Sequence, residues 1–325
     1  MVELLRVATG TDEVVGHADW VEVRAMSKAD QSTSREDLSR AIHRAGTAGD
    51  RARATEDRAR DLADQAFAEL SDRASALATS GRRRFLQYPF ELVENDQMLR
   101  FRPLARSRPF ERGLLYLFLL AITRHSMDAR ERVCAGIDPT KLFERLCADV
   151  LLGFWGGADD RCGNLIVGTA GRTAGSGPFP ASVSTLCQSL KEGGGWKKSA
   201  RSPGAGDAGL DVAVWRRFRD ERPGSLVGFA QCKTGEHWRR DLGKFRPRAF
   251  CGNYMSQPVL IDPQAIYMVP CRINRDRWAD DTRSSEAILF DRCRLVEYGH
   301  AIGLESLNDC NEWLDAAVQI RGATG

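Results

Sequence analysis

The stretch "GLDVAVWRRFRDERPGSLVGFAQCKTG", residues 209–235, constrains the fold of this 325-residue chain more than any other. Each half alternates with the period of a β-strand, and "RDERPG" between the halves has the composition of a turn. The stretch therefore predicts an antiparallel hairpin. One acid, Asp211, stands inside the first apolar run, and one base, Lys233, ends the second. Charges in a hairpin that buries its hydrophobic residues cost free energy unless they have a partner or a role.

The register of this hairpin brings three polar side chains together. Side chains alternate along a strand, so Gln231 and Lys233 share one face. A turn centred on Glu221 places Asp211 opposite Gln231, because both are equally far from that centre. The acid, the amide and the amine then converge. An ordinary salt bridge between Asp211 and Lys233 is the alternative, although burying such a pair seldom stabilises a fold.

These three side chains suit a metal site. Magnesium prefers oxygen ligands, takes one or two carboxylates from the protein and usually keeps several waters. Asp211 offers a carboxylate and Gln231 an amide oxygen, and the backbone carbonyl of Cys232 is a further candidate ligand. Lys233 is a cation and cannot bind the metal. We expect Lys233 to orient an attacking water or to offset charge on a phosphate in the transition state.

A helix is predicted upstream of the hairpin, over "DPTKLFERLCADVLLGFWGG", residues 138–157. Asp138 can cap it, Pro139 fits its first turn, and the two glycines end it. One apolar stripe is formed by Leu142, Leu146, Val150 and Phe154. Glu144 lies on the flank of this stripe. It either faces solvent or points at a site beside the core.

A helix with a Glu, a strand, a strand with an Asp and a strand carrying Gln-Cys-Lys resemble the restriction-endonuclease-like, or PD-(D/E)XK, nuclease superfamily over roughly 138–300. The resemblance implies an α/β fold with a mixed central sheet flanked by helices. Asp211 and Lys233 match the motif, whereas Gln231 replaces the usual Glu and "GL" precedes Asp211 where the motif has Pro. A Gln-x-Lys version is similar to that of methylated-DNA restriction and phage-defence nucleases. Glu144 matches the helix acid of the family and would supply the charge that Gln231 lacks.

The function implied by this resemblance is that of a metal-dependent DNA endonuclease, a phosphodiesterase using Mg²⁺ or Mn²⁺, in a bacterial anti-phage defence system. The implied partners are DNA, a second protein subunit of ATPase or helicase type, and a second copy of the chain for cutting both strands. Two alternatives stay open. One is a non-catalytic nucleic-acid-binding module on the same fold, and the other is a scaffold whose helices at 34–79 dock a partner.

Basic residues surround the hairpin. From Lys197 to Arg248 there are thirteen Lys and Arg against six Asp and Glu, although the whole chain has a net charge of only +3. Such a local excess is typical of a surface that binds phosphates, and equally of a solvated basic face. The candidate nucleic-acid contacts are Lys197, Lys198, Arg216, His237, Arg239 and Arg240.

Several classes of protein are not indicated. The longest apolar run, "GLLYLFLLAI" at 113–122, is too short for a membrane span of ~18 residues. The N-terminus lacks the pattern of a secretion signal, so we expect a cytoplasmic protein without a membrane partner. The nine scattered cysteines include no C-x-x-C pair, which favours reduced thiols. The glycines in "GTAGRTAGSG", 168–177, lack the spacing of a phosphate-binding loop and predict a flexible loop.

Two domains are predicted: an N-terminal α+β recognition or partner-binding domain over 1–136 and a nuclease-like domain over 137–325. For the first we expect strands in "ELLRVA" and "DWVEVRAM", a capping box in "STSREDL", helices at 34–45, 50–79 and 109–127, and a hairpin in "FELVENDQMLRFRP". For the second we expect helices in "FPASVSTLCQSL", "HWRRDLGKF" and "LNDCNEWLDAAVQI", strands in "AIYMVPC" and "EAILFD", and a mobile loop in "KEGGGWKKSARSPGAGDAG".

Overall fold

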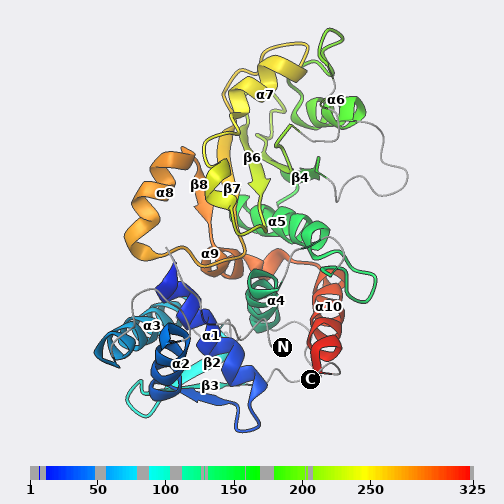
Figure 1. Ribbon diagram of the computed structural model, residues 1–325. Coiled ribbons are helices and arrows are strands. Elements are labelled where there is room, and N and C mark those ends of the chain that lie inside the picture. The colour runs from blue at the N-terminus through cyan, green and yellow to red at the C-terminus, as the bar shows by residue number, and fades with distance from the viewer. Residues whose placement is uncertain are drawn as a thin grey trace. The chain divides into compact units, whose positions relative to one another are not determined.

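The computed structural model describes residues 7, 12–47, 56–78, 88–102, 112–125, 128, 131–157, 159–168, 179–201, 203 and 208–322. It is a mixed α/β protein with two β-sheets (Figure 1). The chain divides into two compact units. One consists of Met1–Ala135, Cys271–Arg275 and Cys310–Gly325, and the other of Gly136–Pro270 and Asp276–Asp309. The predicted hairpin and the helix with Glu144 both lie in the second unit.

The first unit combines helices with a small antiparallel sheet in the order β1-β3-β2. Helix α3 packs against α1 and α2, so its buried side is used within this unit. The elements in chain order are α1 (Glu13–Ser27), β1 (Ser32–Ser34), α2 (Arg35–Thr47), α3 (Glu56–Ala76), β2 (Phe90–Val93), β3 (Met98–Phe101) and α4 (Arg112–Arg124). The closing helix α10 spans Leu304–Gly322, and its residues from Cys310 onward belong to this unit.

Local sequence signals located most of these elements. The capping box is confirmed: the Asp37 N–H donates to Ser34 Oγ at 3.1 Å, and the Ser34 N–H donates to Asp37 Oδ2 at 3.2 Å. The hairpin predicted in "FELVENDQMLRFRP" is confirmed as well, with Val93 of β2 paired to Met98 of β3 around a four-residue turn. The predicted helices correspond to α2, α3 and α4. "ELLRVA" falls almost wholly outside the described residues.

The strand expected in "DWVEVRAM" is wrong, because these residues belong to α1. Burial extends around most of this helix and includes polar residues, so the sequence shows no apolar stripe of helical period. The polar residues bind Arg73 of α3, whose fully buried guanidinium contacts the carboxylates of Asp19, Glu22 and Glu69 at 2.7, 2.9 and 2.9 Å. The hydroxyls of Tyr88 and Tyr116 donate to Glu22 Oε1 at 2.7 Å each.

The second unit is built on a five-stranded sheet in the order β4-β5-β6-β7-β8. Neighbours from β4 to β6 are antiparallel, and those from β6 to β8 are parallel. The strands are β4 (Cys162–Ile166), β5 (Val212–Arg216), β6 (Leu226–Cys232), β7 (Gln264–Met268) and β8 (Ile288–Phe290). The helices are α5 (Pro139–Trp155), α6 (Phe179–Leu190), α7 (Pro247–Tyr254), α8 (Trp278–Ser285) and α9 (Arg292–Glu297). Short 3-10 turns are η2 (Trp238–Asp241), η3 (Arg275–Arg277) and η4 (Gly299–Ala301).

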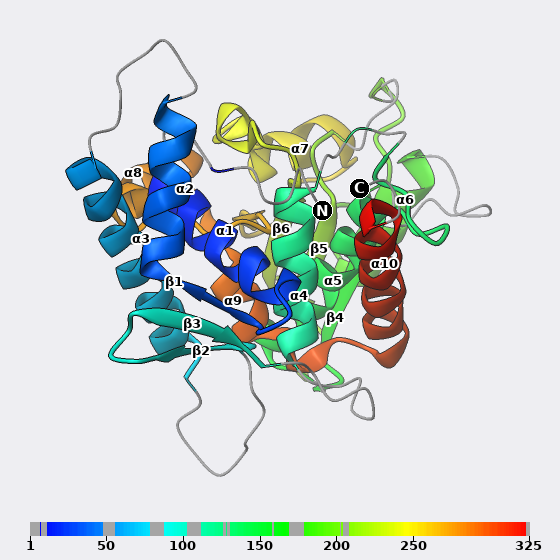
Figure 2. The same ribbon diagram turned by 60° about the horizontal axis from the view of Figure 1, so that its bottom comes forward.

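Helices cover both faces of this sheet. On one face, α5 packs across β4 and β5 (Figure 2), and Asn164 of β4 donates to the Ala148 carbonyl of α5 at 2.8 Å. Gly228 of β6 lies on the same face, where a Cβ would come within 2.9 Å of the Trp155 ring. On the other face, Ala213 and Phe229 join a hydrophobic core with α6 and α7. Alternating strand positions thus fill two different cores.

Helix α5 begins as predicted, with Asp138 accepting a hydrogen bond from the Thr140 N–H at 3.0 Å and Pro139 in the first turn. Its stripe departs from the expectation at one position, because Phe154 is 38% exposed. Glu144, expected on the flank, is only 8% exposed. The strand period and caps also located α6, β7, β8 and α10, but "HWRRDLGKF" contains only the short turn η2.

The remaining expectations have mixed outcomes. In "KEGGGWKKSARSPGAGDAG" the described residues include Trp196, which forms an isolated β-bridge with Met255. Beyond Gly168, the glycine-rich loop of 169–177 lies outside the described residues. All nine cysteines are free thiols, and six of them are buried. In the part of the chain that the structure describes, every helix is too short or too polar to cross a bilayer.

Candidate active site

The β5–β6 hairpin has the register predicted from its turn. Val212 pairs with Ala230, so Asp211, which directly precedes β5, comes opposite Gln231. The Asp211 N–H donates to the Ala230 carbonyl at 3.0 Å. Asp211 and Gln231 are only 7% and 6% exposed. The acid and the amide therefore lie side by side at one end of the sheet, both largely removed from water.

A second carboxylate reaches the same place from α5. A Cβ on Gly168, just after β4, would lie 2.7 Å from Glu144 Oε2 and 3.0 Å from Asp211 Oδ1. The Gly168 N–H donates to the Asp211 carbonyl at 3.0 Å, which holds this backbone against the site. The other carboxylate oxygen, Asp211 Oδ2, accepts a hydrogen bond from the Cys232 N–H at 2.7 Å. Glu144 and Asp211 thus place one oxygen each beside Gly168.

Gln231 contributes a buried amide that is only partly accounted for. Its Oε1 is buried and has no hydrogen-bond partner among the described residues. A Cβ added at Gly209 would lie 3.3 Å from Gln231 Nε2 and 3.2 Å from Phe245. Gly209 has a φ of +84°, a conformation that favours glycine. A buried carbonyl oxygen without a partner costs about 1–3 kcal/mol. A cation bound at this oxygen would remove that cost.

The donor set fits a hard divalent cation. Two carboxylates and one neutral carbonyl oxygen are ligands that Mg²⁺ and Mn²⁺ accept. Among the described residues, no group of three or more His, Cys, Asp or Glu side chains is placed to hold a metal. Among these residues, Glu144 and Asp211 are the two acids beside Gly168, and Gln231 stays a predicted third ligand.

The Cys232 side chain faces α5, the helix that carries Glu144. Its thiol lies against that of Cys147 in α5, and burial raises the pKa of both thiols, that of Cys232 well above its usual range. The charges of Asp211 and Glu144 act in the same direction. Both thiols therefore keep their protons at neutral pH. The Cys232 backbone carbonyl stays a predicted ligand.

Lys233 leaves the sheet directly after β6. Its N–H donates to the Met268 carbonyl of β7 at 3.0 Å. Its Nζ lies 3.5 Å from Asp241 Oδ2 in η2, which is its ion-pair partner among the described residues. The alternative of an Asp211–Lys233 salt bridge across the hairpin is therefore wrong. A side chain that sequence reasoning missed, Asp241, takes that place.

The six predicted nucleic-acid contacts are not gathered at one place. Arg216 ends β5 at the opposite end from Asp211 and donates to the Trp155 carbonyl at 3.2 Å. Arg239 binds Asp281 at 3.0 Å and stacks on Trp238, 4.4 Å from the ring centre. Lys197 Nζ donates to the Gly252 carbonyl at 2.9 Å. Exposed positions are held by Lys198, His237 and Arg240.

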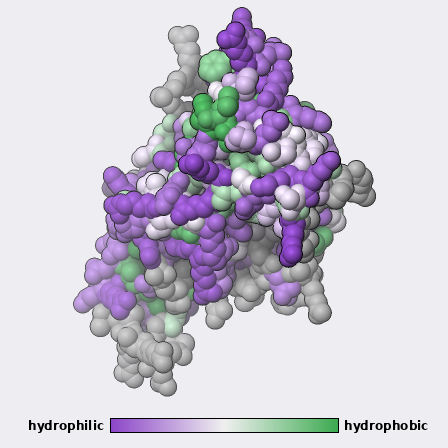
Figure 3. All heavy atoms as spheres, turned by 90° about the horizontal axis from the view of Figure 1, so that it is seen from above, coloured by the Kyte–Doolittle hydropathy of each residue, from purple (hydrophilic) through white to green (hydrophobic). Residues whose placement is uncertain are grey.

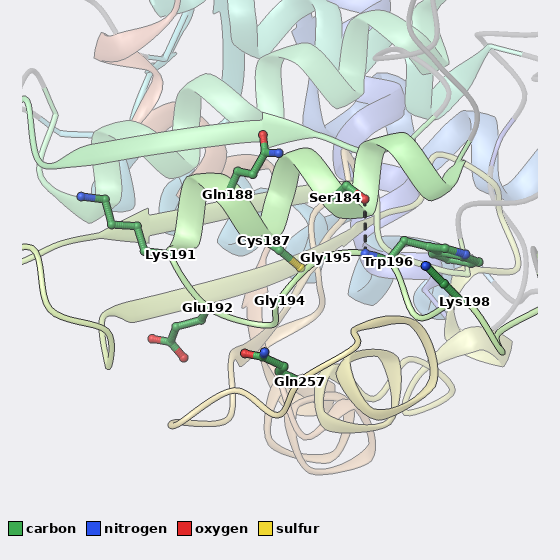
Figure 4. Close-up of a pocket in the computed structure, with 10 residues that line it drawn as sticks. All are labelled: Ser184, Cys187, Gln188, Lys191, Glu192, Gly194, Gly195, Trp196, Lys198 and Gln257. Atoms are coloured by element: carbon green, nitrogen blue, oxygen red, sulfur yellow. Dashed lines mark hydrogen bonds between the residues drawn. The ribbon is translucent and has the colours of Figure 1, made fainter.

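A cavity of about 620 Å³ lies beside α6, away from the carboxylates. Figure 4 shows its walls, formed by α6 on one side and by Gly194, Gly195 and Gln257 on the other. Lys191 at its rim pairs with Glu221 of the β5–β6 turn at 2.8 Å, at the far end of the hairpin from Asp211. Of the predicted site residues, Lys198 lines it. The cavity is therefore separate from the candidate active site.

Comparisons with protein-family models, with curated proteins and with solved structures found no match to this chain. Evidence for its function comes from its own residues. Seen from above, the described surface is mainly hydrophilic with small hydrophobic areas (Figure 3). Such a surface is compatible with many partners and singles out none.

Proposed function

We propose that this protein is a metal-dependent endonuclease that hydrolyses phosphodiester bonds in DNA. One observation carries the proposal: the oxygens of Glu144 and Asp211 meet beside Gly168, and the orphaned Oε1 of Gln231 is buried on the neighbouring strand. Three separate elements supply these oxygens. A purely structural role would leave the amide oxygen of Gln231 buried at a cost.

The topology supports a restriction-endonuclease-like fold for the second unit. A helix with an acid, a strand, a strand preceded by an Asp and a strand carrying Gln-Cys-Lys occur in this order as α5, β4, β5 and β6. All four pack together, with α5 against the three strands. The order alone would be a weak argument, because one fold supports many functions. Its value is that it brings the acids of α5 and β5 to one place.

The residues of the chain would divide the catalytic work. Glu144, Asp211 and Gln231, with the Cys232 carbonyl, would hold Mg²⁺ or Mn²⁺, which when bound supplies a water of lowered pKa and charge stabilisation. The Cys232 N–H fixes Asp211 Oδ2 and so leaves Oδ1 on the side of Glu144. The Lys233 ammonium would donate to the attacking water or to a phosphate oxygen.

The substrate class rests on charge and on the resemblance in the motif. The excess of basic residues between Lys197 and Arg248 favours a polyanion. DNA as that polyanion, a role in bacterial anti-phage defence, a second subunit of ATPase or helicase type and action as a homodimer follow from the Gln-x-Lys resemblance. The first unit would recognise DNA or the partner subunit.

Plasmid cleavage tests the proposal. Wild-type protein is incubated with supercoiled plasmid and Mg²⁺ or Mn²⁺, with and without EDTA, beside Lys233→Ala and a control, Lys191→Ala. Lys191 pairs with Glu221 at the far end of the hairpin, so its loss removes one positive charge without touching the site. We expect nicks from wild type and Lys191→Ala with metal, and much slower nicking by Lys233→Ala. Equal cutting in EDTA, or full activity in Lys233→Ala, would contradict the mechanism.

Binding assays separate this proposal from its alternatives. A non-catalytic nucleic-acid-binding module would retain plasmid, with affinity falling steeply as salt rises, and would leave it uncut with either metal. A scaffold protein would bind no nucleic acid at low salt and would form a stable complex with another protein. Either result would replace the nuclease.

A further inference from the structure

The turn that follows β6 holds Lys233 by its side chain. Asp241 receives two ammonium groups, one on each carboxylate oxygen: Lys244 Nζ lies 2.8 Å from Oδ1 and Lys233 Nζ lies 3.5 Å from Oδ2. The hydrogen bond from Lys244 lowers the pKa of the Asp241 carboxyl, and the charge of Lys233 acts in the same direction. Asp241 is therefore a carboxylate in the folded protein.

The position of Asp241 is itself fixed from two sides. In the same turn, buried Trp238 accepts a hydrogen bond at its carbonyl from Tyr267 of β7, at 2.9 Å. Arg239 binds both carboxylate oxygens of Asp281 in α8, at 3.0 and 3.2 Å. These contacts anchor the turn on β7 and on α8. A carboxylate held this way gives the Lys233 ammonium a fixed partner.

A close backbone approach strengthens this anchoring. Gly243 has a φ of +70°, and a Cβ there would lie only 2.6 Å from the Ser284 carbonyl oxygen of α8. The turn can make this approach because residue 243 has no side chain. The backbone of Lys233 is fixed independently by its hydrogen bond to Met268. The long Lys233 side chain is thus restrained at both ends, at its backbone and at its ammonium.

We propose that Asp241 is a positioning residue for Lys233, an inference that rests on the nuclease function proposed above. A lysine side chain has a flexible four-carbon stem, and its ammonium is a compact point charge that works only at the right place. Asp241 limits the positions that this ammonium samples, and Lys244 holds the other oxygen of the carboxylate. The competing interpretation is a partly exposed ion pair that affects stability slightly and catalysis not at all.

Steady-state cleavage kinetics test this role. We expect Asp241→Asn to lower kcat about 10- to 100-fold, the loss typical of a misplaced catalytic group, with KM and the melting temperature nearly unchanged. Asp241→Glu keeps the carboxylate and should recover most of kcat. The matched control is Asp280→Asn, which removes an exposed acid paired with Arg283 in α8 and should cleave like wild type.

A double variant shows whether Asp241 acts through Lys233. If it does, Asp241→Asn adds no further loss to Lys233→Ala, whereas independent effects multiply. A wild-type kcat for Asp241→Asn, a loss confined to KM, or multiplying losses would overturn the positioning role. If wild-type protein makes no metal-dependent cuts, the nuclease function fails and this inference with it. If wild type cuts, Lys233→Ala cuts much more slowly, and Asp241→Asn equals wild type, only the inference fails.

Discussion

Glu144 and Asp211, which are 67 residues apart in the sequence, each place one carboxylate oxygen at the same glycine. Glu144 Oε2 and Asp211 Oδ1 lie 2.7 and 3.0 Å from the point where a Cβ on Gly168 would stand. Two carboxylates this close repel each other when both are ionised. A bound cation removes the repulsion, which is why the pair indicates a metal site more strongly than either acid alone.

Gly168→Ala should disturb this site and leave the fold intact. The added methyl would occupy the space between the two oxygens and displace them, so metal-dependent cleavage should fall about 100-fold. The matched control, Gly252→Ala, adds a methyl with nothing within 4 Å. Plasmid cleavage and circular dichroism are the measurements. Normal cleavage by a folded Gly168→Ala protein would count against the carboxylate pair.

The substitution Gln231→Leu should affect the free energy of unfolding differently with and without metal. Gln231→Leu removes a buried oxygen without a partner, so in EDTA its free energy of unfolding should equal or exceed that of wild type. With Mn²⁺ at 100 times the dissociation constant, wild type should gain about 2.7 kcal/mol, and the variant clearly less. Chemical denaturation with and without Mn²⁺ measures both quantities. The same metal-induced gain in both proteins would remove Gln231 from the ligand set.

Arg73 should be essential for folding of the first unit. Arg73→Ala removes the cation that Asp19 and Glu22 share, while Glu69 keeps its pair with Arg272 at 3.2 Å, and breaking such a buried cluster typically costs about 3–5 kcal/mol. Arg60→Ala on the same helix breaks an exposed pair with Glu56 and should cost about 0.5 kcal/mol or less. Urea unfolding of the two variants tests the difference. Similar small losses in both would mean that the cluster is not a stabilising anchor.

Cys251 should make stability fall at high pH. Burial, with the neighbouring Cys187 acting in the same direction, raises the pKa of the Cys251 thiol from 9.0 to about 12. The folded protein thus holds this proton more tightly than the unfolded chain. Its contribution is complete below pH 9 and is lost as pH rises towards 12. The unfolding free energy of Cys251→Ala should depend less steeply on pH across this window. Identical slopes would show that the thiol does not contribute.

The hairpin register could be predicted because it depends on local rules. Alternation fixes which side chains share a face, and the turn centre at Glu221 fixes Asp211 opposite Gln231. The burial of Glu144 could not be predicted, because its place on the flank of α5 is equally compatible with solvent. What decides it is the position of β4 and Gly168, a tertiary contact.

The errors have physical causes of the same kind. The α1 segment was expected to be a strand, because valines alternate in "DWVEVRAM" while its buried acids hide the helical period. The alternative to a metal site was an Asp211–Lys233 ion pair. Lys233 pairs with Asp241 in the following turn, and no sequence rule relates these two residues. The short helices α7 to α9 have too few residues for a periodic pattern to show. For α1 and for Lys233, a long-range contact decides what a local pattern leaves open.

Crystals of the protein soaked in Mn²⁺ and measured at the manganese absorption edge test the central claim most directly. The predicted result is an anomalous peak beside Gly168, within coordination distance of Glu144, Asp211 and the Oε1 atom of Gln231. The contradicting result is a crystal whose anomalous map shows manganese elsewhere, or nowhere, while these three side chains keep the positions described above.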